Sequence, residues 1–134
     1  MNPIMARILV VCVASTVFVG CRTDAIYNIV DSPITTASGK ELTLDQVRKA
    51  IIEAGSPKWK MVDVQPGHII GTINISEEQA VVDIKYGTKK YSITYKSSTD
   101  LLYHPDKKRI DIDYTEWVQD LDNAIRAKFS TAGA

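Results

Sequence analysis

Cys21 has the most specific chemical setting in the sequence. Arg7 precedes an uncharged run from Ile8 to Gly20, and Phe18-Val19-Gly20 stand directly before the sulfur. A basic start, an apolar stretch and small residues before a cut are typical of a secretory signal peptide. The pattern therefore predicts a signal peptide over residues 1–20 and a mature chain that begins at Cys21.

A cysteine directly after the predicted cut resembles the bacterial lipoprotein signal. That resemblance implies that the Cys21 thiol receives a diacylglycerol group and becomes the new N-terminus, with fatty acids such as palmitate as the membrane anchor. Phe18 stands where that signal usually has Leu. Arg22 stands where Asp would imply retention in the inner membrane, so the resemblance implies an outer-membrane lipoprotein facing the periplasm.

Two other interpretations of residues 1–20 stay open, a secreted protein without lipid and an uncleaved membrane anchor. A spanning helix needs roughly 20 apolar residues, and the stretch Ile8–Gly20 is shorter. An acylated Cys21 needs no such helix, because two or more buried acyl chains hold a protein on a bilayer.

Composition excludes several classes of protein. Cys12 leaves with the signal peptide and Cys21 is committed to lipid, so the folded part has no thiol for a disulfide, a nucleophile or a metal. The chain has 16 basic and 16 acidic side chains, whereas nucleic-acid binding requires a basic excess on one face. We therefore expect no nucleic-acid partner.

The remaining candidates for chemistry are two histidines and an acidic segment. His68 and His104 belong to no nucleophile or zinc motif. Several carboxylates in the acidic segment invite a calcium site or a glycosidase pair, although Asp113 is better explained as a helix cap. These acidic residues are Asp106, Asp111, Asp113 and Glu116. We predict no catalytic residue, cofactor or metal.

The elements that must position these residues follow from the sequence pattern. Residues 21–41 are predicted as a lipidated N-terminus and tether, in which Ile26–Val30 is apolar enough for a short edge strand before Pro33. Thr43 and Gln46 have capping-box spacing, so a helix begins there and ends at Gly55, expected as its left-handed cap. A second helix follows Asp113, with a stripe made of Tyr114, Trp117, Val118, Leu121, Ile125 and Phe129.

Four strands are predicted between the helices, and the segment from Ser97 to Ile112 is predicted as a polar connection. The strands cover residues 59–64, 68–75, 80–86 and 89–96, with short turns that imply an antiparallel meander. The predicted fold is α+β, a two-layer sandwich in which an N-terminal and a C-terminal helix cover one sheet face. The domain spans residues 42–130, followed by a frayed tail at 131–134.

The uncovered sheet face is the expected working surface. Period-two alternation places seven polar residues on it: Thr72, Asn74, Asp83, Lys85, Ser92, Thr94 and Lys96. A solvated face without a partner is the alternative. Trp59 and Trp117 are expected to be part of the core.

Much of the chain resembles a group of small, functionally uncharacterised proteobacterial lipoproteins. The resemblance is carried by Leu44–Val47, Trp59, Pro66–Thr72, Ala80–Ile84, Tyr91–Ser98, Tyr114 and Trp117-Val118. It implies the fold and a place on the outer membrane, but no activity. Those relatives often have His and Asn where this chain has Asp111 and Thr115.

These observations together predict a non-enzymatic lipoprotein, an interaction or scaffold module of the cell envelope. Its partners would be the membrane, through Cys21, and an envelope protein. One alternative is an envelope hydrolase or polysaccharide-binding protein that uses His68 or the acidic segment. Another is a small-ligand binder with a pocket between the sheet and the helices.

Overall fold

The computed structural model describes residues 22–134. Cys21 and the predicted signal peptide lie outside this range. The described part contains two helices, α1 (Leu44–Gly55) and α2 (Ile112–Thr131). Its strands are β1 (Thr23–Ala25), β2 (Ile29–Pro33), β3 (Trp59–Gln65), β4 (His68–Ile75), β5 (Glu78–Tyr86), β6 (Lys90–Thr99) and β7 (Arg109–Asp111).

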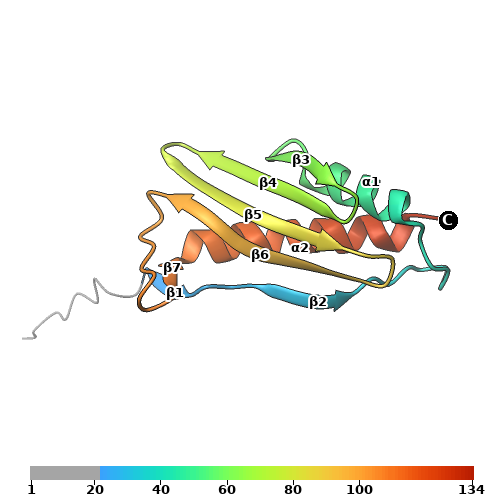
Figure 1. The fold of residues 1–134 in the computed structure, drawn as a ribbon, viewed down its shortest axis with the longest axis horizontal. Helices are drawn as coiled ribbons and strands as arrows, with labels where there is room; N and C mark the ends of the chain where they lie inside the picture. The colour runs from blue at the N-terminus through green and yellow to red at the C-terminus, as the bar shows by residue number, and fades with distance from the viewer. Residues whose placement is uncertain (1–21) are drawn as a thin grey trace, which may run out of the picture.

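The main sheet has five antiparallel strands in the order β2-β6-β5-β4-β3. Both helices lie on one face of this sheet, and α2 runs along most of its length (Figure 1). The predicted α+β class is therefore confirmed, with two helices packed on one face of an antiparallel sheet.

The predicted four-stranded meander is incomplete, because β2 adds a fifth strand beside β6. The segment predicted as a tether forms part of the fold: β2, which carries the buried Ile29, is an edge strand that overlaps the short strand expected at Ile26–Val30 but continues to Pro33. Strand β1 pairs with β7 in a separate two-stranded sheet. Pro33 ends β2 at the sheet edge. Its missing N–H is tolerated there because an edge strand has no neighbour on its outer side.

The segment predicted as a polar connection after residue 96 is also more ordered than expected. Strand β6 continues to Thr99 through a bulge opposite Val81 and Val82, and β7 follows before α2. Helix α2 begins earlier than predicted, because its N-cap is Asp111 rather than Asp113. Asp111 Oδ1 accepts a hydrogen bond from the Asp113 N–H at 3.0 Å. The helix also includes Thr131, which the sequence assigned to the tail.

Helix α1 begins as predicted, with a reciprocal capping box. The Thr43 N–H donates to Gln46 Oε1 at 2.9 Å, and the Gln46 N–H donates to Thr43 Oγ1 at 3.2 Å. The predicted role of Gly55 is wrong, since the cap is Ser56 and Gly55 lies in the last helical turn. A Cβ on Gly55 would lie 2.6 Å from Met61 Cε, so the Met61 side chain of β3 packs directly against the glycine and would have to shift for a larger residue.

One hydrophobic core lies between the helices and the sheet. Ile69, Ile84 and Ile93 are paired across β4, β5 and β6 and have no exposed surface, and they face the helices. The predicted stripe of α2 faces the core, with Trp117 only partly buried, and Trp59 is buried as expected. Among residues 22–134, neither helix is long and apolar enough to cross a bilayer.

Candidate functional site

The face of the main sheet turned away from the helices is its open face. Paired residues on neighbouring antiparallel strands point to the same side, so the register arranges this face in rows. One row contains His68, Lys85 and Ser92, the next Ile70, Asp83 and Thr94, and the third Thr72, Val81 and Ser97. The alternate rows are buried against the helices.

All seven polar residues of the predicted working surface lie on this open face. Thr72 and Asn74 come from β4, Asp83 and Lys85 from β5, and Ser92, Thr94 and Lys96 from β6. Lys96 is the extra residue of the β6 bulge, because Tyr95 pairs with Val82 and Ser97 with Val81. Its ammonium group still reaches the open face, since Nζ lies 3.9 Å from Asp83 Oδ2.

Asp83 is the centre of a small cluster made of His68, Asp83 and Lys96, called here the open-face cluster. His68 Nε2 lies 2.7 Å from Asp83 Oδ1, while Lys96 approaches the other carboxylate oxygen. The side chains of His68 and Asp83 are each 20% exposed. The His68–Asp83 contact is diagonal, since His68 lies in the row of Lys85 and Asp83 in the row of Thr94. With Lys96, the Asp83 carboxylate joins side chains from β4, β5 and β6.

This geometry orients the His68 ring and places the Lys96 ammonium group beside the same carboxylate. A carboxylate holds the imidazole in one orientation, as in many catalytic sites. Nucleophilic catalysis also needs a hydroxyl or thiol within hydrogen-bond reach of the imidazole. Within residues 22–134, the hydrogen bonds of His68 include none to such a group. The cluster presents an oriented ring and an ammonium group on a broad surface, which suits a polar partner.

Sequence reasoning missed the membership of His68 in this face. By itself His68 is indicated only as a strand-start residue, although it shares its side of β4 with Thr72 and Asn74. That alternation was a usable signal for the face. The contact with Asp83 was not readable, because it depends on the register between β4 and β5.

The acidic segment is a separate region of the molecule. Asp111 caps α2, is 4% exposed and lies 3.7 Å from Arg22, whereas Asp106 and Glu116 are exposed. Within residues 22–134, no group of three His, Cys, Asp or Glu residues is placed to hold a metal ion. His68 begins β4 at the opposite end of the sheet from Asp111, and His104 lies in the loop beside Arg109. The structure therefore does not combine these candidates into one site.

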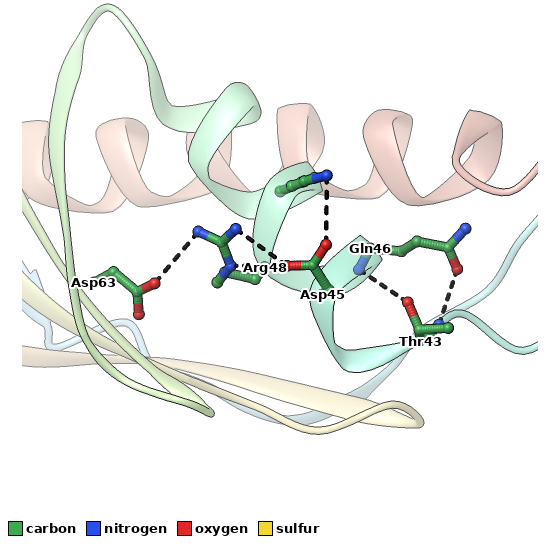
Figure 2. A network of polar contacts seen from close by, with 6 residues as sticks. Thr43, Asp45, Gln46, Arg48 and Asp63 are labelled. Atoms are coloured by element: carbon green, nitrogen blue, oxygen red, sulfur yellow. Dashed lines mark hydrogen bonds and ion pairs between the residues drawn. The ribbon is translucent and has the colours of Figure 1, made fainter.

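A shallow depression between α1 and the end of β3 is organised by Arg48. The guanidinium donates from Nε and Nη2 to Asp45 Oδ1 at 3.2 and 3.1 Å, and from Nη1 to Asp63 Oδ2 at 3.3 Å (Figure 2). The Arg48 hydrogen bonds, with Lys49 beside them, lower the pKa of Asp45. Arg48 thus joins α1 to the sheet edge, and two carboxylates already occupy its donors.

A second groove, of about 570 Å³, lies where the end of α1, the β3–β4 edge and α2 meet. Its lining combines both tryptophans of the chain, Trp59 and Trp117, with Asn74 and the carboxylates of Glu116 and Asp120. Aromatic walls with a few polar groups are typical of small-molecule sites. Both tryptophans were expected as core residues, and Trp117 also forms part of this wall.

No match is found for the chain among models of protein families, curated proteins or solved structures. The resemblance to small proteobacterial lipoproteins thus stays a prediction from the sequence. Function has to be argued from the chemistry of the surfaces, since a fold alone does not specify it.

Sequence reasoning also missed a polar network, called here the core network, in which the buried residues Ser32, Tyr91 and Asp122 meet the exposed side chain of Arg126. The Tyr91 hydroxyl donates to Asp122 Oδ1, and Arg126 donates from Nε to Asp122 Oδ2 at 2.9 Å and from Nη2 to Ser32 Oγ at 3.3 Å. Burial, and then the bond to Asp122, raise the pKa of Tyr91. The network fastens β2 and β6 to α2, which is a structural task.

Proposed function

We propose that the protein is a lipid-anchored module of the bacterial cell envelope that binds a protein partner through the open face of its sheet. The observation that carries this proposal is the open-face cluster. Asp83 holds His68 and Lys96 on a sheet face that neither helix covers. The anchor itself is supported by the sequence pattern around Cys21.

The composition of the open face suits a protein interface. Apolar Ile70 and Val81 lie in the rows that carry Asp83 and Thr72, and Val62 at the sheet edge is 45% exposed. Interfaces mix apolar and polar area in this way, with charged groups fixing orientation and partner choice. Fixed side chains also lose less entropy on binding.

A photo-crosslinking experiment in living cells tests the face. A photoreactive residue at Thr94, in the middle of the face, is expected to give one specific product, whereas the same residue at Lys49 on α1, 63% exposed, gives none. Lys96→Glu should remove the Thr94 product by reversing a charge beside Asp83. A Thr94 product that persists in Lys96→Glu, or equal products from Thr94 and Lys49, would contradict binding through this face.

The anchor is tested separately at Cys21. Mass spectrometry of the mature protein is expected to find an acylated N-terminal cysteine. Cys21→Ser should release the protein from the membrane fraction or leave an uncleaved precursor, because its hydroxyl replaces the thiol that receives the lipid. A mature N-terminus upstream of Cys21, or a free thiol there, would contradict the anchor.

The tryptophan groove supports a second candidate function, binding of a small envelope molecule. Because Trp59 and Trp117 are the two tryptophans of the chain and both line the groove, intrinsic fluorescence reports directly on its occupancy. Titration with soluble peptidoglycan disaccharide-peptides is expected to change the emission and to raise the melting temperature. An unchanged spectrum and melting temperature at millimolar probe would remove this candidate for that ligand class.

A further inference from the structure

The folded domain begins immediately at the predicted lipid site. The carbonyl of Arg22 accepts from the Ile112 N–H at 2.8 Å, and β1 follows at Thr23. Arg109 fixes Thr23 further by donating from Nε to its hydroxyl at 3.2 Å and from Nη2 to its carbonyl. Cys21 precedes Arg22 directly, and consecutive Cα atoms are about 3.8 Å apart. No flexible spacer therefore separates the lipid acceptor from the fold.

This direct connection restricts where the bilayer can lie. A lipid on Cys21 would hold β1, the paired β7 and the start of α2 within a few ångströms of the membrane surface. The loop between β6 and β7 lies beside them at the same end of the molecule (Figure 1). Surfaces at that end must be compatible with lipid headgroups and with the upper acyl chains.

The β6–β7 loop and the start of α2 expose three large apolar side chains, Leu102, Tyr103 and Ile112, called here the anchor-side surface. Leu102 is 52% exposed, Tyr103 40% and Ile112 38%. Their neighbour Leu101 is buried, with 1% of its surface exposed. The loop therefore turns one leucine into the core and the next one outward. Exposed apolar side chains gathered at one place often mark an interaction surface.

The backbone of the loop holds Leu102 in an uncommon conformation. Leu102 has φ +52°, in the left-handed region that a bulky side chain rarely adopts. Such strain persists where surrounding structure enforces it, and it concentrates at functional sites. Here the Asp111 N–H bond to the Leu101 carbonyl, at 2.8 Å, fixes the loop just before Leu102.

Tyr103 is also held rigidly. Its ring stacks on Tyr95 with centroids 4.7 Å apart, and Tyr95 meets the buried Tyr114 edge-on at 5.7 Å. An aromatic side chain supported in this way loses little freedom when it enters a lipid interface. Tyrosine at the headgroup level, with leucine below it, is the usual arrangement at membrane surfaces.

We propose that the anchor-side surface seats the domain on the bilayer, with Leu102 and Tyr103 inserted into the interface beside the acylated Cys21. This inference rests on the proposed lipid anchor. The charges around the surface are mixed, with exposed Lys107 and Lys108 beside exposed Asp106. Insertion is therefore driven by apolar contact and needs no anionic lipid.

The seating gives the domain one orientation. Strand β6 ends at the membrane side, so the sheet extends away from the bilayer and the open face points sideways into the periplasm. The turn between β5 and β6 and the loop before α1 lie at the end of the molecule away from the bilayer (Figure 1). A partner would then approach the open face along the membrane surface.

The experiment uses the full-length acylated protein in vesicles, with a polarity-sensitive fluorophore on a single introduced cysteine. Leu102→Cys and Ile112→Cys report on the anchor-side surface. Val64→Cys is the matched control, because Val64 is 49% exposed but lies near the β3–β4 turn at the opposite end. Vesicles of pure phosphatidylcholine and vesicles with added phosphatidylglycerol are compared, each with brominated lipids as quenchers.

Labels at positions 102 and 112 are expected to shift their emission to the blue and to be quenched several-fold more than the label at 64, equally in both kinds of vesicle. A blue shift and quenching at 102 and 112 that occur only in vesicles with phosphatidylglycerol would overturn the apolar mechanism. Equal, water-like emission at 102, 112 and 64 in a protein that floats with the vesicles and carries lipid by mass spectrometry would overturn the seating alone. Absence of lipid on Cys21 would instead refute the proposed anchor.

Discussion

Asp83 and Ile84 are neighbours on β5 but belong to two different environments. Ile84 faces the helices with no exposed surface, and Asp83 faces the open side in contact with His68 and Lys96. The same contrast separates two polar groups: the core network around Asp122, which is 5% exposed, and the open-face cluster around Asp83. The carboxylate of Asp122 joins elements inside the core, while that of Asp83 joins side chains on the uncovered face.

A fixed polar contact contributes differently to the stability of the protein in these two regions. In the core, an unmet hydrogen bond is costly because water cannot replace it. On the open face, water can solvate whatever a substitution exposes, so a similar contact contributes little to stability. Stability measurements can therefore distinguish the two faces without knowledge of any partner.

The largest effect is expected for Ile84→Ala. Removing three buried carbons from the centre of β5 should lower the free energy of unfolding by about 2–5 kcal/mol, because both burial and packing are lost. Urea unfolding followed by circular dichroism measures this. Lys85→Ala, the next residue on the open face, is the control and should stay within about 0.5 kcal/mol. Similar losses in both variants would show that the open face is covered in solution.

Asp122→Ala is expected to have the next largest effect. The buried Tyr91 hydroxyl would lose its acceptor and Arg126 its carboxylate, which should cost roughly 2–3 kcal/mol of unfolding free energy. Asp120→Ala, an exposed carboxylate two residues earlier on α2, should change stability by at most about 0.5 kcal/mol. Equal urea midpoints for the two variants would contradict a structural role for the core network.

The helix-covered face should also determine the behaviour of the protein at alkaline pH. Burial raises the pKa of Tyr91, Tyr95 and Tyr114 above that of an exposed tyrosine. Their contribution to stability is present below about pH 10, where the unfolded state also keeps the protons, and is lost as pH rises through the folded pKa values. Unfolding free energy should fall by up to about 1.4 kcal/mol per pH unit for each tyrosine that ionises only in the unfolded state.

Urea unfolding between pH 9 and 12 measures this slope, with Tyr114→Phe as the comparison. Tyr114 is fully buried, and its hydroxyl has no hydrogen-bond partner among the described residues. Phenylalanine should therefore be tolerated at neutral pH and should make the alkaline slope shallower. An identical slope in the native chain and in Tyr114→Phe would be the contrary result.

Helices α1 and α2 and strands β3 to β6 could be predicted from the sequence because their signals are local, whereas β7 was expected as part of a polar connection. The Thr43–Gln46 spacing specified the start of α1, and the alternation in β5 and β6 specified which side of each strand is buried. The seven residues of the working surface followed from that alternation. The open face was thus predictable in composition but not in its contacts.

The parts that the sequence did not predict depend on long-range pairing. Strand β2 has a single buried apolar residue, Ile29, and its place beside β6 joins segments about 60 residues apart. The core network similarly needs β6 and α2 in position before Tyr91 can meet Asp122. Gly55 followed a local rule for helix ends, but the close approach of Met61 from β3 decides its role.

The sharpest comparison is expected from two double-mutant cycles, and the second of them should give the smallest effect. Tyr91→Phe with Asp122→Asn should give a coupling energy of roughly 1.5–3 kcal/mol, the range for a buried hydrogen bond to a charged group. His68→Ala with Asp83→Ala should give about 1 kcal/mol or less, because this contact is only partly buried and water can replace it at the surface. The His68–Asp83 contact is as short as a strong hydrogen bond, at 2.7 Å. Weak coupling despite that distance would mean that solvent offsets the interaction, which leaves the pair available for a partner. Coupling as strong as that of Tyr91 and Asp122 would make the open-face cluster a structural clamp and would remove the observation on which partner binding rests.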